Sequence, residues 1–434
     1  MPSGPLTGTR FHRNSAGILC CEGRPLTEIA QAFGTPCYVY SERTLVESYQ
    51  QFAAAAAEKN ALICYALKAN SNLALIALLA AEGAGFDIVS VGELQRVIAA
   101  GGQPNRIVFS GVGKTESEIA AALGAKIKCI NIESEAELHR VAQVASALRL
   151  TAPISLRVNP DIDAKTHPYI STGLKENKFG IPMDLAEAVY RQAKTMPSVM
   201  ITGVDCHIGS QITSLPPFLQ ALDRVLELVD RLNAADIEIQ HLDLGGGLGI
   251  CYDGETPPTP QALLGAIFER LHQWQQTRRS PQPEILFEFG RAIVGNAGVL
   301  LTRVDLLKPG PHKNFAVIDA AMNDLMRPAL YEAWHGVAAV SPSAAQEATW
   351  DLVGPVCESG DWIARDRRLA LSPGDLLAVL SAGAYGMSMS SNYNSRPRAA
   401  EVLIDAQGQA HLIRRREEFT DLIAAESIPD YLRK

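Results

Sequence analysis

The sequence predicts an α/β protein in which a (β/α)8 barrel is joined to a mainly antiparallel β domain. From about residue 61, short apolar runs of strand type alternate with helical segments, and eight such runs follow one another. The runs lack a clean polar–apolar alternation, which is typical of parallel strands buried on both faces. After Arg291, strand-like runs are punctuated by Gly and Pro instead. The 434 residues accommodate a barrel of about 250 residues and a second domain.

The eight expected barrel strands each end in polar or glycine residues. They are residues 61–69, 85–90, 106–111, 128–134, 153–159, 201–210, 239–247 and 284–290. The helical segments expected between them include 73–82, 92–100, 135–148, 184–194, 217–232 and 260–276. Eight consecutive strand–helix units favour a closed barrel over an open sheet.

The β domain is expected to combine both ends of the chain. Its strand-like runs are 292–307, 314–319, 348–353, 375–379 and 399–405. Residues 1–43, which contain Tyr38-Val39-Tyr40, are expected to add one or two strands. The sequence therefore predicts a barrel domain over residues 44–291 and a β domain made of 1–43 and 292–434.

Composition argues against several classes of partner. Lys and Arg number 39 against 47 Asp and Glu, a net charge of −8, whereas phosphate binding needs a basic face. The apolar run 73–81 is far shorter than the roughly 20 residues that a membrane helix needs. We therefore expect no nucleic-acid partner and no membrane partner.

The cysteines and histidines favour a cytoplasmic protein without a metal site. Residues 1–13 contain no apolar stretch of the kind found in signal peptides. The eight cysteines form no C-x-x-C pair, so we expect reduced thiols in the cytosol. The nine histidines fall in no His/Cys cluster with metal-ligand spacing, so no metal is expected.

Chemistry in such a barrel is expected at the C-terminal ends of the strands. The first strand leads to Lys68, a candidate Schiff-base lysine, although a strand-end lysine can also simply reach solvent. The sixth leads to His207, which alone is as compatible with a structural role. The seventh leads to Gly245-Gly246-Gly247, which makes either a tight turn or a phosphate cradle of backbone N–H groups.

The eighth strand ends in Glu288-Phe289-Gly290-Arg291. A carboxylate and an arginine at one rim form either a surface ion pair or a site for a cationic ring nitrogen and an anion. Taken together, a lysine, a histidine, a glycine loop and this Glu/Arg pair are what pyridoxal 5′-phosphate requires. The lysine binds the aldehyde, the glycine N–H groups and arginine bind the phosphate, and the carboxylate faces the ring nitrogen.

From about Tyr38 to Tyr393 the chain resembles the fold-type III pyridoxal-phosphate decarboxylases. The most specific stretch is 157–180, followed by 207–211, 326–331, 357–361 and 382–385. The resemblance implies that Lys68 carries the cofactor and that His207 stacks on its ring. The residues implied to hold the phosphate are Ser210, Gly246, Gly247 and Tyr385. Glu288 is implied to face the pyridine nitrogen, with Gly290 and Arg291 near the phosphate and substrate.

The resemblance also implies a substrate and an assembly. Arg291, Arg327, Tyr331, Glu358 and Tyr385 are implied to bind the substrate, and Cys357 to donate a proton. The implied reaction is decarboxylation of meso-2,6-diaminopimelate to L-lysine and CO2, the last step of lysine biosynthesis. It is expected to take place in a homodimer whose active sites are shared, with Cys357 and Glu358 of one chain completing the site of the other.

Alternative functions stay open at this stage. Ornithine, arginine and carboxynorspermidine decarboxylases have the same general plan, and a non-catalytic pyridoxal-binding protein is a third possibility. Arg327 and Tyr331 are four residues apart, so in a helix they share one face. An arginine fork matches the distal carboxylate of diaminopimelate, which ornithine lacks. A non-catalytic protein is disfavoured because four residues are intact: Lys68, His207, Glu288 and Cys357.

Two positions depart from the family pattern. Phe289 stands where the family usually has Pro, and Val91 stands where it usually has Gly. Neither change removes a charged group, so we expect them to affect local backbone geometry rather than the type of reaction.

Overall fold

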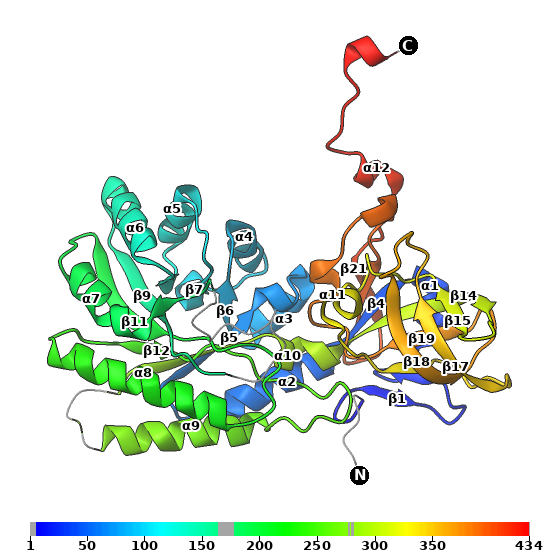
Figure 1. Ribbon diagram of the computed structural model, residues 1–434, viewed down its shortest axis with the longest axis horizontal. Coiled ribbons are helices and arrows are strands. Elements are labelled where there is room, and N and C mark those ends of the chain that lie inside the picture. Colours follow the sequence, from blue (N-terminus) through cyan, green and yellow to red (C-terminus); the bar gives the residue numbers. More distant parts are fainter. Residues whose placement is uncertain (1–5, 164–177, 277, 279–281, 434) are drawn as a thin grey trace. The chain divides into compact units, whose positions relative to one another are not determined.

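The computed structural model describes residues 6–163, 178–276, 278 and 282–433 (Figure 1). Contacts divide the chain into two compact units. The β unit comprises residues 1–45, 252–254 and 295–434, and the barrel unit comprises 46–251 and 255–294. In the described part of the chain, helices are all too short or too polar to cross a membrane.

The barrel unit contains a closed parallel sheet, so the predicted barrel is confirmed. Its strands are β5 (Ala61–Ala66), β6 (Gly85–Ile88), β7 (Ile107–Phe109), β8 (Cys129–Ile132), β9 (Ala152–Asn159), β11 (Val199–Asp205), β12 (His241–Asp243) and β13 (Glu284–Phe289). Each strand pairs in parallel with its neighbours, β13 pairs with β5, and the β8–β9 pairing completes the ring. Most strand residues are buried on both faces, which explains the absence of alternation in the sequence.

Helices follow the strands and surround them in Figure 1. They are α3 (Leu73–Ala81), α4 (Val91–Ala99), α5 (Glu116–Ala125), α6 (Glu135–Leu148), α7 (Met183–Lys194), α8 (Pro216–Ala234), α9 (Pro260–Gln275) and α10 (Arg291–Val294). Polar residues at strand ends also start several of these helices. Ser90 and Ser134 accept backbone N–H bonds at the N-termini of α4 and α6, and Thr115 forms a capping box with Glu118. These caps begin the helices α4, α5 and α6 shortly after the strands that precede them.

The β unit is built on one mixed sheet in the order β18-β17-β15-β14-β4-β20-β21, with β19 also paired to β14 and to β16. The strands are β4 (Cys37–Ser41), β14 (Gly298–Lys308), β15 (Phe315–Ile318), β16 (Val337–Ala339), β17 (Glu347–Val353), β18 (Trp362–Ala370), β19 (Leu376–Val379), β20 (Ala400–Ile404) and β21 (Ala410–Arg414). Pairing is antiparallel except for β15–β17 and β4–β20. The predicted mainly antiparallel β domain is therefore confirmed.

The N-terminal segment contributes one central strand, as expected. Strand β4 lies between β14 and β20, and its residue Val39 is fully buried with Leu301 and Val402. The preceding strands β1 (Phe11–Arg13), β2 (Leu19–Cys21) and β3 (Arg24–Pro25) form a small sheet of their own. Two helices, α1 (Leu26–Phe33) and α2 (Glu42–Ala55), flank β4 in the chain.

The expected strand over residues 292–307 is wrong in its first part. Residues 291–294 form α10 and residues 295–297 a single 3-10 turn, so β14 begins only at Gly298. A short apolar run does not distinguish a buried helix from a buried strand, and here it supplies the helix after the eighth barrel strand. Strand β18 was missed because charged side chains interrupt its apolar residues.

Candidate active site at the mouth of the barrel

Lys68 lies at the C-terminal end of the first barrel strand. Strand β5 ends at Ala66, two residues before the lysine, and a 3-10 turn over Leu67–Ala69 carries it onward. Its Nζ lies 3.3 Å from Oδ2 of Asp87, the penultimate residue of β6. The lysine side chain is 36% exposed whereas that of Asp87 is fully buried. An amine that solvent and ligand can reach is thus held against a buried carboxylate.

The glycine loop after β12 can be built only from glycine. A Cβ on Gly246 would lie 1.8 Å from the carbonyl oxygen of Glu288, and one on Gly247 would lie 2.2 Å from that of Gly209. Gly247 also has a positive φ of 96°. The loop therefore passes directly over the ends of β11 and β13. A backbone without side chains at this rim fits a phosphate group bound by N–H donors.

His207 lies beside this loop and is held as a neutral ring. Its Nδ1 accepts a hydrogen bond from the backbone N–H of Gly246 at 3.2 Å. Burial lowers the pKa of His207 well below its usual value, and the nearby charges of Lys68 and Arg157 lower it further. A neutral imidazole fixed by the glycine loop is suited to stacking on an aromatic ligand.

Ser210 and Arg291 lie together at the same end of the barrel. The guanidinium of Arg291, the first residue of α10, donates to the Ser210 hydroxyl at 3.0 Å. Arg291 is buried, and Gly290 before it packs closely enough that a Cβ would lie 2.9 Å from Cβ of Ala69. A hydroxyl, a guanidinium and glycine N–H groups form a donor set that fits a phosphate ester.

Three buried carboxyl groups lie at the bottom of the barrel mouth, and we call this cluster the floor. Glu288 on β13, Asp205 on β11 and Asp243 on β12 are buried, and each has a carboxylate oxygen within 4.8 Å of those of the other two. The Ser110 hydroxyl donates to Glu288 at 3.3 Å. Burial raises the pKa of Glu288 well above its usual value, with further contributions from Asp243, Asp87 and Asp205.

This carboxyl cluster is short of positive charge. Burial also raises the pKa of Asp205 well above its usual value. It raises the pKa of Asp243 to about 7. A ligand that brings a cationic N–H group to Glu288 relieves this excess. Three carboxylates can also bind a metal ion, but a protonated ring nitrogen satisfies the same cluster and matches the phosphate cradle beside it. The rim thus fits pyridoxal phosphate at both ends, with hydrogen-bond donors for the phosphate and a carboxylate acceptor for the ring nitrogen.

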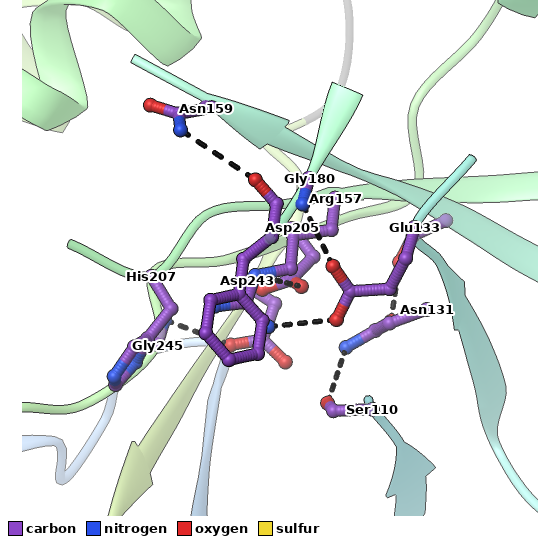
Figure 2. A network of polar contacts seen from close by, with 12 residues as sticks. Ser110, Asn131, Glu133, Arg157, Asn159, Gly180, Asp205, His207, Asp243 and Gly245 are labelled. Carbon is purple, nitrogen blue, oxygen red and sulfur yellow. Dashed lines mark hydrogen bonds and ion pairs between the residues drawn. The ribbon is translucent and has the colours of Figure 1, made fainter. Parts of the chain in front are cut away.

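Figure 2 shows the polar network that holds the floor in place. Arg157 on β9 donates to Glu133 at 2.8 Å, and its Nε lies 3.9 Å from Oδ2 of Asp205. The backbone N–H of Gly180 donates to the other Glu133 oxygen at 2.8 Å. The guanidinium also lies over the Phe179 ring, 4.8 Å from its centroid. This network joins the two described ends of the family-specific stretch 157–180, whose residues 164–177 lie outside the described part of the chain.

The remaining predicted site residues belong to the β unit. Arg327 and Tyr331 are the first and last residues of helix α11 (Arg327–Tyr331), and Arg327 is buried. Its guanidinium donates to the Tyr252 hydroxyl at 3.0 Å and contacts Nε2 of His335 at 2.8 Å. Tyr385 adopts a left-handed backbone conformation with φ of 56°.

Cys357 and Glu358 are exposed on a tight turn of the β unit. Asp361 organises the turn: its two carboxylate oxygens accept the N–H groups of Met322 at 2.7 Å and Val356 at 2.8 Å. The N–H of Cys357 donates to the Asn394 side chain at 2.9 Å. The structure therefore presents the thiol and carboxylate outward on a fixed loop.

The barrel thus gathers eight of the predicted site residues at one rim: Lys68, His207, Ser210, Gly246, Gly247, Glu288, Gly290 and Arg291. Sequence analysis missed Asp87, Arg157, Asp205 and Asp243. The available signal was a charged residue inside or at the end of an otherwise apolar barrel strand. His335 and Tyr252 gave no such signal, because their partner Arg327 is brought to them only by the fold.

Comparisons with known proteins agree with this reading of the site. Residues 42–295 match the family described as "Pyridoxal-dependent decarboxylase, pyridoxal binding domain". The chain is 58% identical to the diaminopimelate decarboxylase of Pseudomonas aeruginosa, over 94% of this chain and 97% of that protein. It is 55% identical to that of Vibrio cholerae, over 96% and 99%. A solved structure of diaminopimelate decarboxylase from M. jannaschii in complex with L-lysine matches with a TM-score of 0.93 and 38% identity, covering 99% of this chain and 100% of that chain.

The barrel, the β unit and the rim define a fold-type III pyridoxal-dependent enzyme. The 55% and 58% sequence identity to diaminopimelate decarboxylases, over nearly the whole length, identifies the family within this class of enzymes. The chain belongs to the pyridoxal-dependent decarboxylases and, within them, to the diaminopimelate decarboxylase family.

The raised pKa of Asp243 predicts a pH-dependent effect of removing its charge. The folded protein keeps the Asp243 proton up to about pH 7, whereas the unfolded chain releases it near pH 4. Its contribution to stability is therefore full below pH 4 and is lost as the pH rises to about 7. Without added cofactor, Asp243→Asn should gain thermal stability relative to the wild type between pH 4 and 8.

Asp405 provides a control of opposite sign. A hydrogen bond from His411 lowers the pKa of this half-buried aspartate, so Asp405→Asn should lose stability relative to the wild type as the pH rises toward about 4. A stability difference between Asp243→Asn and wild type that stays constant with pH would contradict the assignment of a buried, protonated Asp243.

Proposed function

We propose that this protein decarboxylates meso-2,6-diaminopimelate to L-lysine and CO2, with pyridoxal 5′-phosphate as its cofactor. The observation that carries the proposal is the rim itself, where a lysine, a glycine cradle and a buried glutamate meet. The identity of 58% and 55% to diaminopimelate decarboxylases supports this substrate over ornithine or arginine.

Each rim residue has a proposed role. Lys68 holds the cofactor covalently, and His207 lies against one face of its ring. The residues proposed to bind the phosphate are Ser210, Gly246, Gly247, Gly290, Arg291 and Tyr385. When bound, pyridoxal phosphate supplies an electron sink for the charge that CO2 leaves behind.

Glu288 is proposed to keep a proton on the ring nitrogen. The buried carboxyl groups of Asp205 and Asp243 raise the cost of ionising Glu288 when nothing cationic is present. A cationic N–H at that position lets Glu288 ionise and form a charge-assisted hydrogen bond. By holding that proton in place, Glu288 would favour loss of CO2.

The far end of the substrate requires a second set of residues. We propose Arg291, Arg327, Tyr331, Glu358 and Tyr385 as binding residues and Cys357 as the donor of the proton that replaces CO2. Cys357 is exposed next to Glu358, so the turn presents a thiol and a carboxylate together.

The proposed location follows from the cysteines. The proposed domain limits follow from the sequence and differ by a few residues from the limits of the contact units, 45 and 294. All eight cysteines are free, and six are buried, which suits a reducing cytoplasm. We propose residues 44–291 as the cofactor-binding domain and residues 1–43 with 292–434 as the domain that completes the active site.

The substrate is tested by supplying the protein and pyridoxal phosphate with meso-diaminopimelate, ornithine or arginine and measuring CO2. We expect CO2 from diaminopimelate only, with L-lysine as the other product. Lys68→Ala should abolish CO2 release and the borohydride-reducible link to the cofactor. Lys128→Ala is a matched control, since Lys128 pairs with Glu284 at the opposite end of the barrel strands.

Two results would contradict the proposal. CO2 from ornithine or arginine but not from diaminopimelate would assign another substrate. A reducible link retained in Lys68→Ala would show that another amine carries the cofactor.

We further propose a homodimer with shared active sites, in which Cys357 and Glu358 of one chain serve the barrel of the other. The exposure of both residues on a fixed turn supports this assembly. A two-fold interface then creates two equivalent sites. Lys68→Ala and Cys357→Ala, each inactive alone, should regain activity when their subunits exchange, because a mixed dimer carries one intact site.

The expected recovery is about a quarter of wild-type activity at equal mixing, since half of the dimers are mixed and each has one good site. Subunit exchange is followed independently with differently tagged chains. If exchange is complete and activity stays absent, each chain builds its own site and the shared-site proposal is wrong.

A further inference from the structure

A buried histidine in the β unit contacts the arginine proposed to bind the distal carboxylate. His335 is fully buried, and its Nε2 lies 2.8 Å from the Nη1 of Arg327. Its Nδ1 lies 2.8 Å from the carbonyl oxygen of Leu380. The sequence did not predict this contact, because His335 lies eight positions beyond Arg327 and outside its helix.

The two contacts fix the protonation of the ring. A guanidinium can only donate hydrogen bonds, and a carbonyl oxygen can only accept them. Nε2 of His335 must therefore accept from Arg327, while Nδ1 carries the hydrogen and donates to Leu380. A ring protonated on both nitrogens would place an N–H group against the guanidinium. His335 thus serves the arginine as a neutral acceptor in a single tautomer.

The backbone around His335 is anchored on both sides. The N–H of Leu380 donates to the carbonyl oxygen of Gly336 at 2.8 Å, which extends the β16–β19 ladder. The guanidinium of Arg367 on β18 donates to the carbonyl oxygen of His335 at 3.1 Å. The acceptor that faces Arg327 is therefore placed by strands rather than by a loose loop.

Tyr252 holds the same guanidinium from a second direction. Its hydroxyl accepts from Nη1 of Arg327 at 3.0 Å, and the guanidinium carbon lies 4.8 Å from its ring centroid. The Tyr252 and His335 rings meet edge to face at 5.2 Å between centroids. An arginine side chain has many rotamers. Because Tyr252 and His335 both bind Nη1 of Arg327, together they fix the direction in which the guanidinium points.

We propose that His335 is a positioning residue for substrate specificity: it fixes the guanidinium of Arg327 so that the site selects ligands with a distal carboxylate. This inference rests on the proposed function, because it takes Arg327 as the residue that binds that carboxylate. His335 itself touches the arginine and not the substrate. Its effect is therefore confined to ligands that bear the carboxylate.

Two inhibitors isolate that carboxylate. L-Lysine and 1,5-diaminopentane share the same five-carbon diamine, and only L-lysine carries the distal carboxylate. Their inhibition constants are measured on the dimeric holoenzyme against turnover of meso-diaminopimelate. The wild type should bind L-lysine more tightly than 1,5-diaminopentane.

His335→Leu should raise the inhibition constant of L-lysine about ten-fold or more, the size expected when a charged group loses a buried hydrogen-bond partner. That of 1,5-diaminopentane should change less than about two-fold, because it does not use the arginine. His335→Gln can place an acceptor where Nε2 lies and should stay within about three-fold of wild type for L-lysine. His411→Leu, at an exposed histidine paired with Asp405, is the matched control and should alter neither constant.

Tyr252→Phe keeps the ring and removes the acceptor, so it should weaken L-lysine selectively by a smaller factor than His335→Leu. It decides the question if His335→Leu does not fold. Equal weakening of both inhibitors, or no change for L-lysine in a folded variant, would overturn the inference and leave His335 as a structural residue. If the wild type neither turns over diaminopimelate nor prefers L-lysine, the proposed function itself fails and the inference falls with it.

Discussion

The organisation of the barrel mouth depends on carboxyl groups that the closed sheet removes from water. Glu288, Asp243 and Asp205 end or nearly end three consecutive strands, so their side chains converge at one end of the barrel. The guanidinium of Arg157 lies 3.9 Å from the Asp205 carboxylate. Burial therefore favours the protonated acids until a cation arrives. Such a cluster suits the positively charged ring nitrogen that we propose for it.

The rest of the rim is consistent with such a ligand. The glycine loop lies so close to the Glu288 and Gly209 carbonyl groups that side chains are excluded, which leaves backbone N–H groups for a phosphate. Lys68 occupies the end of the neighbouring strand with its amine against Asp87. The carboxyl groups, the Lys68 amine and the glycine loop come from several strands. The hydrogen-bonded pairing of these strands in the barrel fixes the distances between them. In the β unit, neighbouring side chains likewise hold a charged group in place: His335 and Tyr252 both contact the guanidinium of Arg327.

Much of this could be predicted from the sequence, because parallel barrel strands are apolar runs of defined length and their ends carry the chemistry. Lys68, His207 and Glu288 were predicted as site residues in this way, and the (β/α)8 barrel with its β domain is confirmed. The N-terminal strand β4 was also expected, from Tyr38-Val39-Tyr40. Residues 292–297 were predicted to be part of a strand because a short apolar run carries no periodicity that separates helix from strand.

The buried charges were the part that sequence reasoning could not supply. Asp205 directly precedes Cys206-His207, yet its meaning depends on Asp243 and Glu288, which lie 38 and 83 residues further along. Their mutual approach is a product of barrel closure, and so is the rise in their pKa values. His335 is a similar case, since its contact with Arg327 depends on the fold, which places the Leu380 carbonyl oxygen against the other ring nitrogen.

The central claim is that Glu288 and the buried carboxyl groups beside it keep a proton on the ring nitrogen of the cofactor. It is tested most directly by the 15N NMR shift of pyridoxal phosphate labelled at that nitrogen, bound to wild-type protein and to Glu288→Gln. The account predicts a protonated nitrogen in the wild type at neutral pH and an unprotonated one in Glu288→Gln, which still binds the cofactor. An unprotonated nitrogen in the wild type, or the same protonated shift in both proteins, would contradict it.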